Sequence, residues 1–146
     1  MAKDNKRSTG IAGLDLTMDG GFPFGTAIVV LGSPLAGVDH MARQFWSVDK
    51  DSGSYLMIDG DVETGMSDAR GATPEDLLSF SRGDRIVIDS LSSIILRFGF
   101  DEGLACMARA KQEICSRKGN VMFVLYSELH QTREEIQILR MADVVL

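Results

Sequence analysis

Two glycines with the spacing of a phosphate-binding loop are the most informative residues of this sequence. Gly32 and Gly37 follow the apolar run of residues 26–31 and precede a segment with helical periodicity. Glycines five residues apart let backbone N–H groups wrap around a phosphate at the start of a helix. When such a loop hydrolyses ATP, a lysine follows to reach the β and γ phosphates, and then a serine or threonine to hold Mg²⁺. Here Val38 and Asp39 stand at those two positions.

These two residues change what the loop can do. A valine cannot neutralise phosphate charge, and a carboxylate repels a nucleoside triphosphate. At a helix start, the Asp39 carboxylate can also bond the N–H groups that a phosphate would occupy, so we expect the loop to block its own anion site. The candidate phosphate loop comprises Gly32, Ser33, Pro34, Leu35, Ala36, Gly37, Val38 and Asp39.

Two other interpretations of the loop stay open. In the plainer one, the segment is a strand-to-helix turn in which Asp39 is an ordinary first-turn acid. In the other, the backbone amides still bind nucleotide, with a cation supplied by a partner subunit or with Mg²⁺ held by Asp39. The neighbouring His40 is expected to be a surface or packing residue.

Three aspartates are the remaining candidates for chemistry. Asp89 ends one apolar run, and Asp59 and Asp61 follow another. Because the carboxyl ends of parallel strands meet at one edge of a sheet, the three carboxylates could converge there. Asp59 and Asp89 are therefore candidate catalytic groups, and all three are candidate metal ligands. Without a nucleotide, we expect Asp89 to bond the neighbouring loop, for example Ser33 or Ser90.

Apolar runs alternate with helical patterns along the chain, which is typical of a parallel sheet covered by helices. None of the runs alternates strictly between apolar and polar residues, so we expect central strands with both faces buried. The runs are residues 26–31, 54–58, 85–89, 121–126 and 143–146. Helices are predicted over 36–49, from Thr73, from Asp101 to Gly119, and from a capping box at Thr132 and Glu135, with a loop at Phe98–Phe100.

The order of these motifs resembles a known family. The chain runs from Ser8-Thr-Gly-Ile-Ala-Gly-Leu-Asp15 through Gly20-Gly-Phe-Pro-Phe-Gly25 to the glycine loop. This opening is similar to that of the KaiC/RadA-like branch of the RecA-like P-loop ATPases, with Asp89 at the Walker B acid. The resemblance implies an α/β fold of three layers, α/β/α, with a mostly parallel sheet and a minimal RecA-like core. It also implies a single domain over residues 1–146, in which residues 1–25 lead into the core.

The chain departs from that family at the end of the second strand as well as in the loop. KaiC-like proteins carry a pair of glutamates there that polarise the attacking water, whereas this chain has Asp59 and Gly60. The aspartate is one methylene shorter, and a displacement of about an ångström can reduce catalysis by roughly 100-fold. The resemblance therefore implies an inactive paralogue with a degenerate Walker A motif.

Composition narrows the class of protein. The 146 residues are 45% hydrophobic and 25% charged, which suits one globular core, and no run reaches the roughly 18 apolar residues of a membrane helix. We therefore expect a cytoplasmic protein. The net charge of −6, with basic residues clustered only from Lys3 to Arg7, disfavours a nucleic-acid partner. Cys106 and Cys115 lie on nearly opposite faces of a predicted helix, so we expect no disulfide between them.

The function that we expect is that of a non-catalytic pseudo-ATPase module that regulates or binds a protein, with no cofactor and with a protein partner or a second copy of itself. One alternative is a RecA-family protein that binds or hydrolyses Mg-ATP weakly. A second alternative is a metal-dependent phosphohydrolase built on Asp59, Asp61 and Asp89. Core packing is expected for the aromatic residues that could otherwise form a partner face, which are Phe22, Phe24, Trp46, Phe98 and Phe100.

Overall fold

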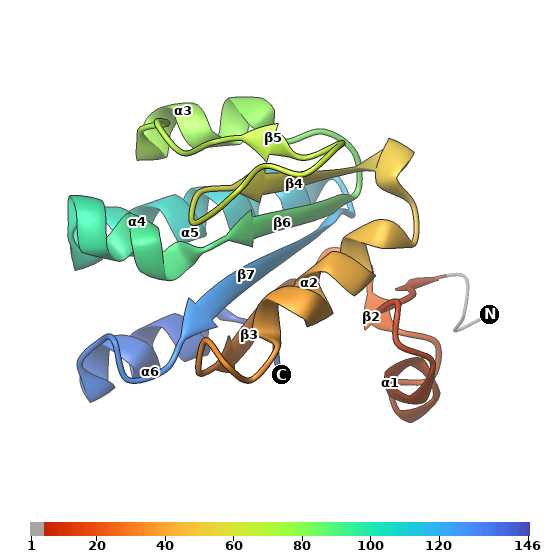
Figure 1. Ribbon diagram of the computed structural model, residues 1–146. Coiled ribbons are helices and arrows are strands. Elements are labelled where there is room, and N and C mark those ends of the chain that lie inside the picture. The colour runs from red at the N-terminus through yellow and green to blue at the C-terminus, as the bar shows by residue number, and fades with distance from the viewer. Residues whose placement is uncertain (1–4) are drawn as a thin grey trace.

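A six-stranded sheet forms the centre of the computed structural model, which describes residues 5–146 (Figure 1). All neighbouring strands of this sheet are parallel, in the order β5-β4-β6-β7-β3-β8. The strands are β3 (Ala27–Gly32), β4 (Gly53–Met57), β5 (Ser67–Asp68), β6 (Arg85–Asp89), β7 (Asn120–Tyr126) and β8 (Val144–Val145). Lys3, part of the basic run noted above, lies outside the described residues.

Four of the five predicted strands are confirmed to within a residue at either end, and all four lie inside the sheet. The fifth prediction, a central strand at residues 143–146, is wrong about its position. β8 pairs only with β3, at the edge of the sheet, and Val145 is 47% exposed. Valines are as typical of half-exposed strands as of buried ones, so their presence did not distinguish an edge from a centre.

Successive side chains of the strands point to opposite faces of the sheet, and each face has its own layer of helices. Leu56, Ile86 and Val121 pack into a core shared with α3, α4, α5 and α6, whereas Tyr55 and Val87 pack with α2 on the other face. Figure 1 shows α2 crossing this second face. The helices are α2 (Val38–Ser47), α3 (Pro74–Leu77), α4 (Leu91–Phe98), α5 (Phe100–Ser116) and α6 (Thr132–Met141). The three-layer α/β/α fold with a parallel sheet is confirmed.

The helix predictions were right about existence and less accurate about ends. α2 begins at Val38 rather than at residue 36, because Gly37 adopts a left-handed conformation with φ of 79°. α3 begins as predicted, with the Thr73 hydroxyl accepting a hydrogen bond from the Asp76 N–H. α6 has its capping box one residue earlier than predicted, between the side chains of Gln131 and Glu134.

The predicted loop around Phe98 is wrong, because a helix occupies most of this segment. α4 begins directly after β6, and the Ser90 hydroxyl caps it by accepting a hydrogen bond from the Ser93 N–H at 3.1 Å. Gly99, with φ of 96°, then separates α4 from α5. The apolar residues 91–95 continue the apolar β6 without a polar break, so the pattern hid the change from strand to helix.

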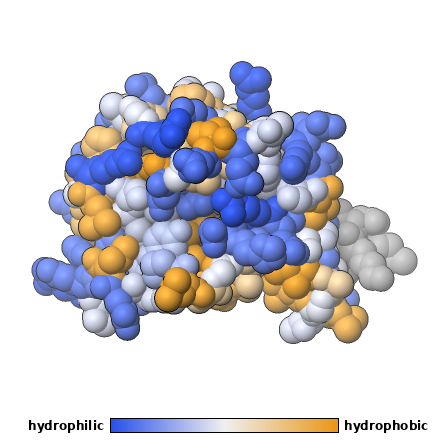
Figure 2. Space-filling view, viewed as in Figure 1, coloured by the Kyte–Doolittle hydropathy of each residue, from blue (hydrophilic) through white to orange (hydrophobic). Residues whose placement is uncertain are grey.

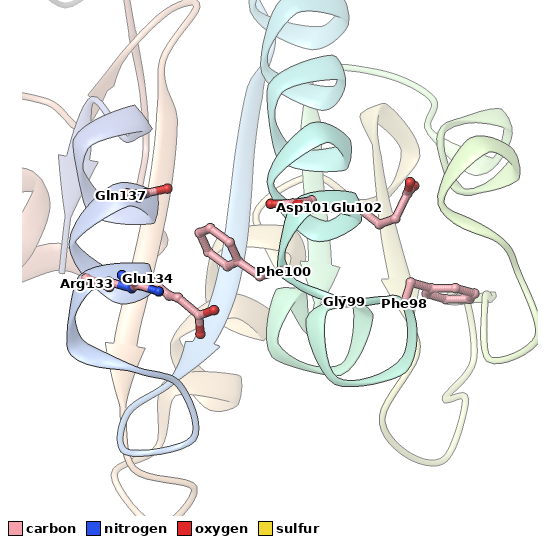
Figure 3. Close-up of a pocket in the computed structure, with 8 residues that line it drawn as sticks. All are labelled: Phe98, Gly99, Phe100, Asp101, Glu102, Arg133, Glu134 and Gln137. Atoms are coloured by element: carbon pink, nitrogen blue, oxygen red, sulfur yellow. The ribbon is translucent and has the colours of Figure 1, made fainter.

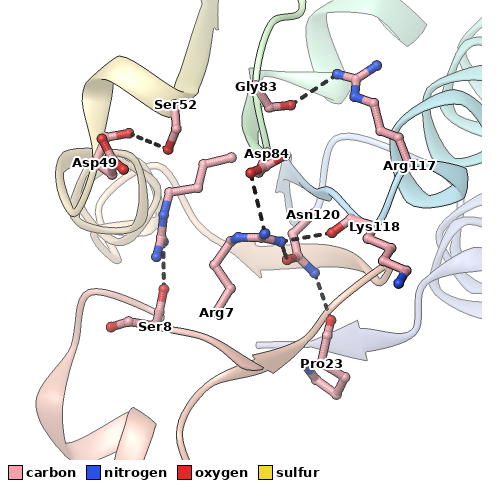
Figure 4. Close-up of polar contacts among 11 residues, drawn as sticks. Arg7, Ser8, Pro23, Asp49, Ser52, Gly83, Asp84, Arg117, Lys118 and Asn120 are labelled. Atoms are coloured by element: carbon pink, nitrogen blue, oxygen red, sulfur yellow. Dashed lines mark hydrogen bonds and ion pairs between the residues drawn. The ribbon is translucent and has the colours of Figure 1, made fainter. Parts of the chain in front are cut away.

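The N-terminal segment is fixed to the amino ends of the strands by a polar cluster (Figure 4). It contains β1 (Lys6–Arg7), α1 (Ala12–Thr17) and β2 (Phe22–Pro23). Arg7 donates hydrogen bonds to Asn120 Oδ1 at 2.6 Å and to the Lys118 carbonyl at 3.0 Å, and lies 3.6 Å from Asp84. Asn120 in turn donates to the Pro23 carbonyl at 2.9 Å. This cluster lies at the opposite end of the sheet from the glycine loop.

The cysteines and most of the aromatic residues are structural. Cys106 is buried, Cys115 is half-buried, and both are free thiols, so the expectation of no disulfide between them is confirmed. Phe22 and Trp46, the latter on α2 itself, are buried in the core between α2 and the sheet. Phe98 is the most exposed of the five aromatic candidates, at 39%. Among the helices of residues 5–146, none combines the length and the apolar character needed to cross a bilayer.

Candidate functional site

The glycine loop joins the carboxyl end of β3 to the start of α2. Ser33, Pro34, Leu35, Ala36 and Gly37 are all exposed, and the Leu35 side chain at the tip is 98% exposed. The loop therefore has the position and the helix start that an anion-binding loop requires.

Val38 is part of the core rather than of the loop surface. Its side chain is only 5% exposed and packs with the apolar residues of α2 and the sheet. A Cβ atom added to Gly32 would lie 2.8 Å from Val38 Cγ1 and 3.3 Å from Ala36 Cβ, so the valine closes the inner side of the loop. A side chain held in this way offers a phosphate neither a charge nor a hydrogen-bond donor.

Asp39 does not block the loop as the sequence suggested. Its carboxylate lies 3.4 Å from Arg43 Nη1, one helical turn further along α2, and it caps none of the first amides of the helix. Arg43 also forms a 2.7 Å ion pair with Glu63, which lies in the loop after β4. The Asp39 side chain is thus held by Arg43 and accepts no hydrogen bond from the first amides of the helix. His40 is exposed and contacts only Gln44 by a hydrogen bond, at 3.1 Å, which agrees with a surface residue.

Asp89 is buried, with 2% of its surface exposed, and its partner is not the one expected. One carboxylate oxygen, Oδ2, accepts a 2.6 Å hydrogen bond from the Tyr55 hydroxyl of the neighbouring strand β4, rather than from Ser33 or Ser90. The other oxygen, Oδ1, has no hydrogen-bond partner within the described part of the chain. Burial raises the pKa of Asp89 to about 6, against the effect of the Tyr55 hydrogen bond and with help from the charge of Asp59.

The predicted acids meet at one cavity of about 370 Å³, at the carboxyl edge of the sheet. Asp59 accepts a hydrogen bond from the Ser90 N–H at 3.1 Å, and both Asp59 and Asp61 are exposed. The sequence analysis missed Arg43 and Glu63, and also Tyr55 and Tyr126. The i, i+4 spacing of Asp39 and Arg43 was a usable signal for the arginine. The lining residues are Asp39, Arg43, Met57, Asp59, Gly60, Asp61, Glu63, Asp89 and Tyr126.

The cavity is strongly acidic. Among the described residues that line it, five carboxylates face one arginine, which leaves four net negative charges when all are ionised. The charge affects Tyr126. Burial is the main cause that raises the pKa of its hydroxyl, and the charges of Asp89, Asp59 and Asp39 raise it further. Despite the number of acids, no three carboxylate, histidine or cysteine side chains in residues 5–146 are arranged to hold a metal ion. The site therefore favours cations in general without forming a metal cage.

A separate cavity of about 670 Å³ lies where α5 begins beside α6 (Figure 3). In Figure 3 the Phe100 ring points toward α6, whereas the Phe98 ring points away from it. None of the candidate site residues predicted from the sequence lines this cavity, which is bordered by Phe98, Gly99, Phe100, Asp101, Glu102, Arg133, Glu134 and Gln137. We therefore treat the acidic cavity as the candidate site.

Comparisons with known proteins identify the fold. No protein-family model and no curated protein matches the sequence. Among solved structures, the KaiC-like protein PH0186 from the hyperthermophilic archaeon Pyrococcus horikoshii OT3 matches with a TM-score of 0.70 and 18% identity, over 97% of this chain and 80% of that one. The flagellar accessory protein FlaH from Methanocaldococcus jannaschii matches with a TM-score of 0.59 and 17% identity, over 91% and 75%. The chain therefore shares the RecA-like α/β/α fold of these two proteins.

Proposed function

We propose that this chain is a non-catalytic module with a RecA-like fold, which does not use a nucleotide and acts by binding a protein. The observation that carries this is the position of Val38, which is buried where a lysine would have to reach phosphate. The loop keeps its glycines and its helix start, but it has no cation of its own to face a nucleotide.

The charge of the neighbouring cavity works in the same direction. A nucleoside triphosphate bound to the loop would place its terminal phosphates beside carboxylates that exceed the positive charges by four. Arg43, the one cation in the lining, is already paired with Asp39 and Glu63. Opposite unit charges 4 Å apart gain about 4 kcal/mol at an effective dielectric of 20, and like charges lose a similar amount. This charge excess supports the proposal that the loop holds no nucleotide.

The residues that would activate water are also unsuited to hydrolysis. Asp59 is bound to the Ser90 N–H, and Gly60 supplies no side chain. Asp89 is bound to the Tyr55 hydroxyl and is buried. Each of the two candidate catalytic acids is thus already held by a hydrogen bond, and Asp89 is also shielded from solvent, which disfavours general-base catalysis.

A protein partner is the remaining use for the loop. Leu35 extends almost fully into solvent at its tip, and Leu129 is 48% exposed in the loop after β7, which is hydrogen-bonded to the end of β3 through Ser127 and Gly32. Exposed leucines on neighbouring loops are suited to contact with another protein, whether a KaiC-like ATPase or a second copy. A tagged protein should then retain one defined partner that Leu35→Glu releases.

Thermal unfolding tests the absence of nucleotide binding. The unfolding midpoint should move by less than 1 °C between 5 mM MgCl₂ and 5 mM Mg-ATP. A bound ligand at 100 times its dissociation constant would instead add about 2.7 kcal/mol to the free energy of unfolding and raise the midpoint by roughly 10 °C. The matched variant carries Val38→Lys and Asp39→Thr, which restore the two missing groups. A shift only in this variant would assign the loss of binding to those positions.

A shift of several degrees in the unchanged protein would contradict the proposed function. It would favour the alternative of a weak nucleotide-binding enzyme, and phosphate release that disappears in Asp89→Ala would then establish hydrolysis.

A further inference from the structure

The acidic cavity combines a charge excess with an unsatisfied buried oxygen. Within the part of the chain that the structure describes, no lysine or arginine lies within 4.0 Å of Asp59, Asp61 or Asp89. Asp89 Oδ1, which belongs to a side chain that is 98% buried, has no hydrogen-bond partner. Buried polar atoms are nearly always paired in proteins, so an unpaired carboxylate oxygen on a residue that lines a cavity points to a missing donor.

The missing donor should carry a positive charge. Arg43 does not supply it, because it is bound to Asp39 and Glu63, and the Tyr55 hydroxyl already donates to the other oxygen of Asp89. The Tyr126 hydroxyl lines the cavity but donates no hydrogen bond to Asp89 within the described residues. A charged donor also gains from the four excess negative charges of the lining. An anion would meet the opposite field.

The shape of the site suits an organic cation better than a metal ion that has lost its water. No three ligand side chains among residues 5–146 are arranged around one point, as a dehydrated metal would need. The carboxylates are instead distributed along a cavity of about 370 Å³, with Met57 and Tyr126 also in its lining. A planar guanidinium carries five donors that can serve several carboxylates at once, and its alkyl chain and plane pack on apolar and aromatic groups.

We propose that this cavity binds a guanidinium group. The inference deepens the proposed function and rests on it, because a nucleotide must leave the site free. It identifies the group that the partner would present, which is an exposed arginine side chain or a small free guanidine. On the face shown in Figure 2, hydrophobic residues form separate small groups among hydrophilic ones, which suits recognition by charge.

Amide chemical shifts in the intact protein test this directly. Three probes are titrated at pH 8 in 50 mM salt: agmatine, the capped peptide Gly-Arg-Gly, and the same peptide with neutral citrulline in place of arginine. Agmatine or the arginine peptide should shift the amides around Asp59, Asp61 and Asp89 saturably, whereas the citrulline peptide should not. Binding of the arginine peptide at least as tightly as agmatine identifies a protein side chain as the source, and binding of agmatine alone identifies a free ligand.

Variants separate the site from general attraction to an acidic protein. The double variant Asp59→Asn/Asp61→Asn changes two exposed residues, so the fold should persist. This variant should weaken binding of the arginine peptide and of agmatine at least tenfold. The control Glu113→Gln removes an exposed charge on α5, on the other side of the sheet, and should leave binding unchanged. Equal weakening by both variants would overturn the inference.

The pH dependence is a second readout. Binding should be several-fold weaker at pH 5 than at pH 8, because protonated Asp89 loses its charge. The titratable groups that face Asp89 are Tyr55 on β4, Asp59 after it, Asp39 and Arg43 on α2, and Tyr126 on β7.

The outcomes also separate this inference from the proposed function. If neither agmatine nor the arginine peptide binds saturably, or if MgCl₂ causes the same shifts at lower concentration, the guanidinium site is wrong while the absence of nucleotide binding stands. If Mg-ATP binds, the proposed function itself is wrong.

Discussion

The buried carboxyl group of Asp89 makes the stability of the protein depend on pH. A carboxylic acid whose pKa is raised on folding stabilises the protein below its unfolded pKa, near 4, and this contribution is lost as the pH rises through its folded pKa. For Asp89 the loss occurs between about pH 4 and pH 7, because its folded pKa is about 6. A shift of this size corresponds to roughly 3 kcal/mol.

Asp89→Asn should therefore raise the stability of the protein at pH 8 by about 2 kcal/mol, because the amide resembles the neutral acid and can still accept the Tyr55 hydrogen bond. At pH 4 the two proteins should be equally stable. Urea unfolding at both pH values measures this, with the exposed Asp61→Asn as the control. A less stable Asp89→Asn at pH 8 would show that the ionised form is favoured in the fold.

Gly32 and Val38 should be energetically coupled, because the valine occupies the space that a larger residue at Gly32 would need. Gly32→Ala should destabilise the protein by about 1–3 kcal/mol, as overpacking does. In a Val38→Ala background the same change should cost at least 0.5 kcal/mol less. Strictly additive free energies of unfolding in this double-mutant cycle would mean that Val38 does not close the loop.

The residues of the site show what could be predicted at this scale. Asp59, Asp61 and Asp89 were found from their places at the ends of predicted strands, because parallel topology brings these positions together. Asp39 was found from its place after the glycine loop. Glu63 could not be found, since its pairing with Arg43 spans 20 residues and depends on the path of the loop after β4. The partner of Asp89 was missed for the same reason, because Tyr55 lies on the neighbouring strand.

Among the elements, the N-terminal segment depends on a few polar contacts with the sheet. Arg7 joins β1 to Asn120 and Lys118, and its guanidinium lies 4.3 Å from the centre of the Phe24 ring. Arg7→Ala should therefore increase hydrogen exchange of residues 5–25 at least tenfold, while the amides of β6 and β7 keep their protection. The comparison variant is Arg117→Ala, which removes an exposed hydrogen bond to the Gly83 carbonyl. Unchanged exchange in residues 5–25 would show that β2 and α1 hold the segment without Arg7.

The elements also differ in how visible they were in the sequence. β3, β6 and β7 are continuous apolar runs between polar segments, as expected of strands buried on both faces. α4 was invisible because its apolar residues follow β6 directly, and β5 was invisible because Ser67–Asp68 carries no apolar pattern. In both cases the pairing or packing of distant segments, rather than local sequence, determines the element.

At the scale of the whole molecule, the chain combines a RecA-like fold with an acidic cavity at the carboxyl edge of its sheet. The fold matches the KaiC-like protein and FlaH over more than nine-tenths of this chain. The glycine loop and four aspartates lie at one edge of the sheet. The loop has no lysine, and the described lining of the cavity carries one arginine against five acids. The architecture was predictable from motif order, whereas the charge balance required the positions of Arg43 and Glu63.

The most direct test of this account is a titration of ¹⁵N-labelled protein with Mg-ATP, following the amides of the loop from Gly32 to Asp39, with Val38→Lys/Asp39→Thr as the matched variant. The account predicts no saturable shift of these amides up to 10 mM Mg-ATP in the unchanged protein, because no cation is in place to hold phosphate against the acidic cavity. Saturable shifts of the Gly32 to Asp39 amides in the unchanged protein would show that the loop still binds nucleotide, and would contradict the account.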